Sequence, residues 1–121
     1  MSNAKEVLDE LSSNIDGFMS AALVDGSTGM ILGSVGSGID IEVAAAGNSE
    51  VVRSKLKTMQ NLGLKDHIED ILITLGKQYH ILRPAEKYDG IFFYIVLDKS
   101  KSNLAMARRQ VLNAEGKVKI M

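Results

Sequence analysis

Residue types that could perform chemistry are scarce in this chain. It has no cysteine and only two histidines, His67 and His80. Without cysteine there can be no disulfide, no thiolate zinc site and no thiol nucleophile. On an expected strand, His67 and Glu69 share a face while Asp70 points away, and a catalytic zinc normally takes three protein ligands. We therefore expect no metal site. We interpret His67 as a polar residue that connects a helix to a strand, and His80 as an ordinary sheet residue.

A glycine-rich loop covers residues 33–38 and lies between an expected strand and an expected helix. Phosphate-binding loops occupy that position, because backbone N–H groups and the helix dipole favour an anion there. The Walker pattern needs Lys-Ser/Thr after its last glycine, whereas Ile39-Asp40 follows here. Asp40 would repel a phosphate and suits the N-cap of the helix. Since no serine lies in a Gly-x-Ser-x-Gly elbow either, we expect no catalytic residue, no cofactor and no enzymatic activity.

The charge of the chain is balanced, with 14 Lys plus Arg against 15 Asp plus Glu. A formal net charge of −1 argues against sequence-independent nucleic-acid binding, which needs a basic surface. One local basic cluster is formed by Arg108 and Arg109 with Lys99 and Lys101 nearby. We interpret it as a solvated face, and a docking site for an acidic partner is the alternative.

The chain has 121 residues, of which 45% are hydrophobic. This length predicts a single domain, residues 1–121, with one hydrophobic core. The longest apolar run, Ile91 to Leu97, is much shorter than the about 20 residues that span a membrane. The first residues also lack the apolar centre of a signal peptide. We expect a cytoplasmic protein that does not insert into a membrane.

The first half of the chain shows clear periodicity. Apolar residues at helical spacing from Ala4 predict an amphipathic helix, with Asn3 and Glu6 as its capping box. Residues 18–24 and 30–35 predict two strands joined by a glycine-containing hairpin loop. A long helix is predicted from Ile41 to Leu62, capped by Asp40.

The second half predicts three strands and a helix. The strands cover 68–75, 78–83 and 91–97, and Gly76-Lys77 suits a type I′ or II′ turn between the first two. The third strand is apolar throughout and is expected at the sheet centre, covered on both faces. A helix over 103–115 and a disordered tail, Gly116 to Met121, complete the order α-β-β-α-β-β-β-α. Tight hairpins predict an antiparallel sheet, with helices on both faces.

The element order and one segment resemble a known family. The run Ala21-Ala22-Leu23-Val24-Asp25 turns through Thr28-Gly29 into Met30-Ile31-Leu32-Gly33. It resembles the Roadblock/dynein light-chain family, most of all its stand-alone prokaryotic members, over a core of about residues 5–115. The resemblance implies an α+β, profilin-like fold: a five-stranded antiparallel sheet with the long helix on one face and the terminal helices on the other. The family has no shared catalytic motif.

The resemblance also implies partners. Members form homodimers or heterodimers in which the long helices and the third strands meet across a two-fold axis. They associate with small Ras-like GTPases or with motor complexes, as regulators or scaffolds.

The long helix independently favours a dimer, because its apolar residues cover more than one stripe. The expected strand 68–75 is also apolar and would be an aggregation hazard if its edge were exposed. A wide core-facing stripe is the alternative interpretation of the helix. The candidate interface residues are Ala44, Ala45, Asn48, Val51, Val52, Ile71 and Ile73.

The sequence therefore predicts a non-catalytic dimeric interaction module that regulates or scaffolds a small Ras-like GTPase. The alternative is a small-molecule sensor domain with a pocket between the sheet and the helices.

Overall fold

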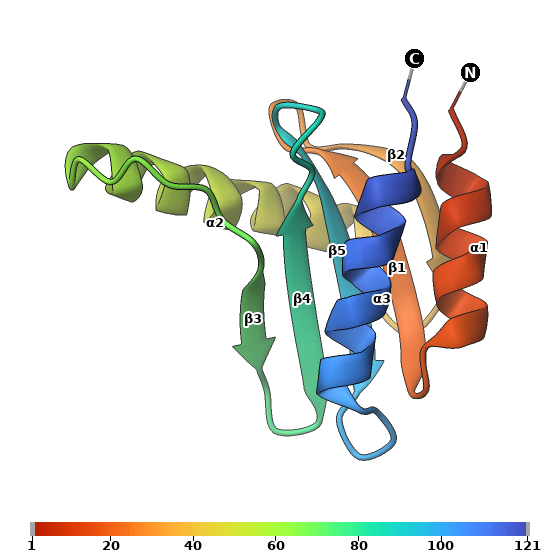
Figure 1. Cartoon of the computed structure of the whole chain (residues 1–121). Coiled ribbons are helices and arrows are strands. Elements are labelled where there is room, and N and C mark those ends of the chain that lie inside the picture. Colours follow the sequence, from red (N-terminus) through yellow and green to blue (C-terminus); the bar gives the residue numbers. More distant parts are fainter. Residues whose placement is uncertain (1, 121) are drawn as a thin grey trace.

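A computed structural model describes residues 2–120, and Figure 1 shows how the elements are arranged. The order of elements is the predicted one, α-β-β-α-β-β-β-α. The helices and strands are α1 (Ala4–Asn14), β1 (Phe18–Asp25), β2 (Met30–Gly36), α2 (Ile41–Asn61), β3 (Ile71–Thr74), β4 (Gln78–Pro84), β5 (Ile91–Asp98) and α3 (Leu104–Lys117).

The strands form one five-stranded sheet in the order β2-β1-β5-β4-β3, and every pairing is antiparallel. Helices α1 and α3 cover one face of the sheet, and α2 crosses the other face (Figure 1). The predicted α+β fold with helices on both faces is confirmed. None of the helices within residues 2–120 combines the length and the apolar character needed to cross a membrane.

Strand β5 is central, as its uninterrupted apolar sequence predicted. Residues 92–97 are all fully buried. Because side chains alternate along a strand, Phe93, Ile95 and Leu97 pack toward α1 and α3. The side chains between them, Phe92, Tyr94 and Val96, belong to the core shared with α2. One strand thus contributes to two separate hydrophobic layers.

The predicted strand 68–75 was too long, since β3 covers only Ile71–Thr74. Pairing of β3 with β4 begins at Ile71 opposite Leu82, and its continuation would place residue 69 opposite Pro84. Proline has no N–H to give to the ladder. Arg108 instead holds Asp70 through two hydrogen bonds of 2.8 Å each. The preceding segment, residues 64–70, therefore runs back along α2 without strand pairing.

The turn between β3 and β4 also differs from its prediction. The N–H of Leu75 donates to the carbonyl of Gln78 at 2.9 Å, which closes the hairpin. Neither Gly76 nor Lys77 has a positive φ, whereas type I′ and II′ turns require one. The turn type predicted from the sequence was wrong, although the hairpin itself forms where expected.

The two ends of the described chain are joined, which corrects two predictions. Val118 is fully buried in the described part of the tail, whereas the sequence predicted disorder. Met121 lies outside the described residues. The side chain of Asn3 accepts from the N–H of Lys119 at 2.7 Å and donates to the carbonyl of Lys117 at 2.9 Å. It does not cap α1, so the predicted capping box is absent.

Candidate interaction surface

Helix α2 is longer than the sheet beneath it is wide. Its 21 residues span about 30 Å at 1.5 Å per residue. The outer strand axes of a five-stranded sheet are about 19 Å apart. Accordingly, the C-terminal part of α2 projects past β3 into open space (Figure 1). We call residues 57–64 the overhang; they comprise the C-terminal end of α2 and the three residues that follow it.

The α2 residues predicted for an interface divide into two groups. Ala45 and Val52 point into the core that α2 shares with the sheet, with 0% and 5% of their surface exposed. Ala44 packs against the same core and is half-buried. Val51 faces outward, and a shallow groove of about 500 Å³ runs beside it on the outer face of α2. Different apolar residues of α2 therefore contribute to the core and to the surface.

The overhang exposes large apolar side chains. Leu62 is 65% exposed and Leu64 is 53% exposed, and Leu56 at its base is 40% exposed. Only Met59 of this part of α2 is buried. Large apolar side chains that gather at an exposed helix end are typical of a contact surface.

Strand β3 lies at one end of the sheet and is paired only with β4 among the described residues. The N–H of Leu75 points toward β4. Because these groups alternate in direction along an antiparallel ladder, the N–H groups of Leu72 and Thr74 point outward. Ile71 and Ile73 are half-buried, with side chains on the α2 face. The open edge and the overhang lie on the same side of the molecule (Figure 1).

A chain of polar side chains connects α2 with β5 and β4. The hydroxyl of Tyr94 lies near the Asn48 side chain and 2.9 Å from Nδ1 of His80. Nε2 of His80 lies 2.9 Å from Oε1 of Gln78. A carbonyl oxygen can only accept, so we assign the proton of neutral His80 to Nε2, and Nδ1 accepts from Tyr94. Sequence reasoning took His80 as an ordinary sheet residue and missed this role, although Gln78 and His80 share one strand face.

Burial shifts the pKa values of both titratable members of this chain. It raises the pKa of Tyr94, while the polar side chain of Asn48 nearby opposes that shift. Burial lowers the pKa of His80 below its ordinary value of 6.5. The neutral imidazole is therefore the form that the fold favours.

We expect the free energy of unfolding to fall when the pH decreases below about 6.5, the ordinary pKa of histidine. The unfolded chain then binds a proton more readily than folded His80 does, so protons favour unfolding. The free energy of unfolding continues to fall until the pH is below the lowered pKa of His80 in the folded chain. Urea unfolding at several pH values between about pH 7.5 and about pH 5.5 measures this loss of stability. This range lies above the pH at which most carboxylates titrate.

Replacing His80 tests this prediction. His80→Gln should flatten the pH dependence, because it removes the group whose pKa differs between the folded and unfolded chain. An unchanged slope in His80→Gln would contradict the assignment.

An open groove of about 660 Å³ lies beside the end of the polar chain, where Met19, Gln78 and Lys99 line it together with the turn between β3 and β4. It opens to solvent at the end of the sheet. It does not match the enclosed pocket between sheet and helices that the sensor alternative predicted.

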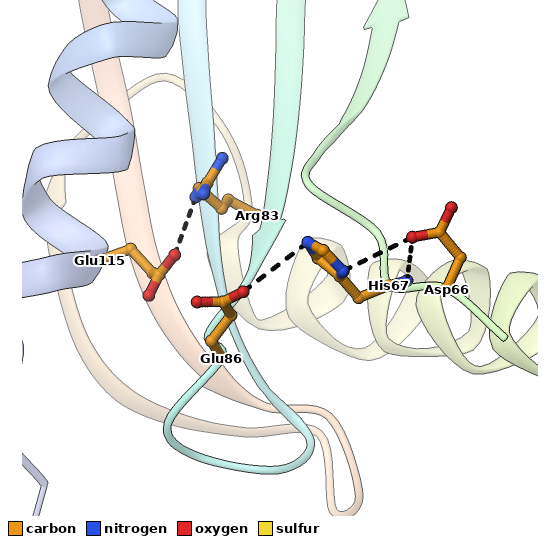
Figure 2. Close-up of polar contacts among 5 residues, drawn as sticks. All are labelled: Asp66, His67, Arg83, Glu86 and Glu115. Atoms are coloured by element: carbon orange, nitrogen blue, oxygen red, sulfur yellow. Dashed lines mark hydrogen bonds and ion pairs between the residues drawn. The ribbon is translucent and has the colours of Figure 1, made fainter.

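Charged residues elsewhere hold elements together. Arg83 and Glu115 form an ion pair at 3.1 Å with both side chains largely buried, and it joins β4 to α3 (Figure 2). The Asp70 carboxylate raises the pKa of Arg108 by hydrogen bonding. The predicted basic cluster is thereby divided, because Arg108 is paired with Asp70. No group of three His, Asp or Glu side chains within residues 2–120 is placed to hold a metal ion.

Solved structures share this fold. A Roadblock/LC7 domain from Streptomyces avermitilis matches with a TM-score of 0.81 and 13% identity, over 93% of this chain and 91% of that one. MglB from Myxococcus xanthus matches with a TM-score of 0.81 and 16% identity, over 93% and 89%. A gliding protein MglB from Thermus thermophilus matches with a TM-score of 0.78 and 16% identity, over 91% and 81%.

These likenesses confirm the Roadblock-type fold that the sequence predicted. No family model matches the sequence. No curated protein matches it.

Proposed function

We propose that this chain is a non-catalytic interaction module that acts as a homodimer and regulates or scaffolds a small Ras-like GTPase. The observation that carries the proposal is the overhang of α2 beside the open edge of β3. Both features leave apolar or hydrogen-bonding groups without a partner in the described chain, and both lie on one side. A second copy can cover both at once.

Antiparallel pairing of two β3 strands would continue the sheet from one copy into the other. The two-fold axis would then run perpendicular to the sheet, through the middle of the β3 pair. The outward N–H groups of Leu72 and Thr74 would gain carbonyl acceptors. Edge pairing of this kind removes an exposed strand edge and is typical of stable assemblies.

The same rotation would bring the overhang of each copy over the sheet of the other. In one chain, α2 crosses near the end of β4, where Val52 and Leu56 approach Pro84 and Ala85. Because the two-fold axis reverses the direction of the strands, the partner's α2 would cross the opposite end of β4. The partner's overhang would therefore lie near the start of β4 in the first copy. That region holds His80 and the open groove at Gln78. The exposed leucines of the overhang would supply the apolar contact.

The charged residues that flank β3 favour pairing of β3 with the β3 strand of a second copy. Glu69 precedes the strand, and Lys77 follows it. In an antiparallel pair, the residues before one strand lie beside those after the other. Opposite charges in such cross-strand positions are stabilising by a few tenths of a kcal/mol to about 1 kcal/mol each.

The GTPase part of the proposal rests on the family resemblance and on the fold. The resemblance implies association with Ras-like GTPases, and two of the structures with this fold are MglB proteins. Another MglB structure is described as having a tetrameric arrangement, so self-association of the fold has a precedent there. The absence of a catalytic arrangement in the sequence favours regulation through binding.

Binding of the purified dimer to small GTPases from the same cell tests this function. Each GTPase would be loaded with GDP or with a non-hydrolysable GTP analogue and titrated calorimetrically. We expect binding that prefers one nucleotide state, because regulators distinguish the two conformations. A folded dimer that binds neither state would exclude the GTPase part and leave the interaction module.

A further inference from the structure

A third concave surface lies within one chain, where α2 faces the loop between β4 and β5. It is a cleft of about 240 Å³, closed on a third side by the segment that precedes β3. Its apolar lining consists of Val52, Leu56, Ile68, Pro84, Ala85 and Ile91. Val52 and Ala85 are buried, while Leu56 is 40% exposed and accessible from the cleft. The floor can therefore take an apolar group of moderate size.

The rim of this cleft is acidic. Asp66, Glu86 and Asp89 line it together with His67. The imidazole of His67 lies between two of these carboxylates, with Nδ1 at 3.5 Å from Asp66 and Nε2 at 3.7 Å from Glu86 (Figure 2). These separations are longer than hydrogen bonds. The Asp66 carboxylate also accepts from the backbone N–H of His67 at 2.8 Å.

Three cationic side chains of the neighbouring segments make contacts elsewhere. The guanidinium of Arg53 donates to the carbonyl of Gly26. Lys87 donates to the carbonyl of Gly116 at 3.3 Å, and Arg83 is paired with Glu115. Within residues 2–120, no lysine or arginine forms an ion pair with the three rim carboxylates. The rim thus presents negative charge above an apolar floor.

We propose that this cleft docks an arginine side chain carried between apolar residues on a partner protein. The methylene stem of arginine suits the apolar floor, and its guanidinium has five N–H donors that can reach several carboxylates together. His67 already places a nitrogen-bearing ring between Asp66 and Glu86, which shows that the two carboxylates face one planar donor group. The cleft is built from one chain, so its occupation does not depend on the proposed dimer or on a GTPase.

The experiment uses a short peptide, acetyl-Leu-Arg-Leu-amide, titrated into the isotope-labelled full chain and followed by amide NMR shifts. The same peptide with citrulline in place of arginine removes the charge and keeps the shape. We expect saturable shifts confined to residues 52–56, 66–68 and 84–91 with the arginine peptide. The citrulline peptide should bind about tenfold more weakly, since it loses several charged contacts that each contribute up to about fivefold at an exposed rim.

Variants separate specific docking from general attraction of a cation. Glu86→Gln with Asp89→Asn should weaken arginine-peptide binding by about tenfold. The matched control, Glu6→Gln with Asp16→Asn, removes the same charge from exposed positions outside the cleft and should leave the affinity within about twofold. Leu56→Ala should also weaken binding, because it reduces the apolar lining.

Three results would overturn the proposal. The first is the absence of shifts around the cleft. The second is equal binding of the arginine and citrulline peptides, which would mean that the site recognises apolar groups only. The third is equal weakening by the control pair of substitutions, which would mean unspecific attraction.

Discussion

Replacing Ala45 with glutamate should abolish cooperative folding of this chain. Ala45 is fully buried between α2 and the sheet, in the core that contains Val52 and Tyr94. The longer side chain has no space there, and a buried carboxylate without a partner costs several kcal/mol. A domain of this size has a total stability of about 5–15 kcal/mol. One substitution can therefore remove most or all of it.

Circular dichroism during heating measures this effect. The wild-type chain should unfold in one cooperative transition, and Ala45→Glu should show none or one at a much lower temperature. Ala46→Glu is the matched control, because Ala46 is the next residue of α2 and is exposed. It should keep a cooperative transition. Similar destabilisation by both substitutions would contradict the assignment of Ala45 to the core.

Replacing Thr74 with proline should convert the proposed dimer into a monomer that remains folded. Thr74 is exposed and its N–H points away from β4, toward the open edge. Proline removes that N–H and places its ring at the edge, while the pairing of β3 with β4 keeps its hydrogen bonds. By symmetry both copies lose one bond, so dimerisation should weaken by about 100-fold.

Light scattering at tens of micromolar gives the mass of each variant. The wild-type protein should have about twice the mass of one chain, and Thr74→Pro should have about the mass of a single chain. Thr74→Ala keeps the N–H and should remain dimeric at the same concentration. A wild-type monomer would refute the dimer itself. A dimeric Thr74→Pro would instead show that the copies meet elsewhere than along β3.

Local signals in the sequence were sufficient for the elements and their layers. The unbroken apolar run in β5 predicted a strand buried on both faces, and residues 92–97 are fully buried. Asp40 was predicted as the cap of α2, and its carboxylate accepts from the N–H of Val43 at 3.2 Å. Signals of this kind depend on residues close in sequence, so they hold where no distant segment competes for the same groups.

Errors arose where a residue finds its partner far along the chain. Asn3 has the sequence of a helix cap, yet its side chain bonds to Lys119, which no local pattern could indicate. The segment before β3 is apolar enough for a strand, but Pro84 cannot extend the ladder and Arg108 holds Asp70. The tail was predicted to be disordered, whereas Val118 is buried.

The candidate surface was predictable only in part. The sequence showed that α2 has more apolar residues than one core-facing stripe requires, and that the strand after it is apolar. It could not separate Ala45 and Val52, which pack inward, from Val51 and Leu62, which face outward. That separation depends on where α2 crosses the sheet.

By itself, the sequence determined the order of the elements and the central position of β5, because periodicity and residue type act locally. Only the tertiary structure decided that α2 projects past β3, that His80 joins a polar chain with Tyr94, and that acidic residues surround an apolar cleft. Each of these depends on contacts between segments that the chain brings together only when it folds.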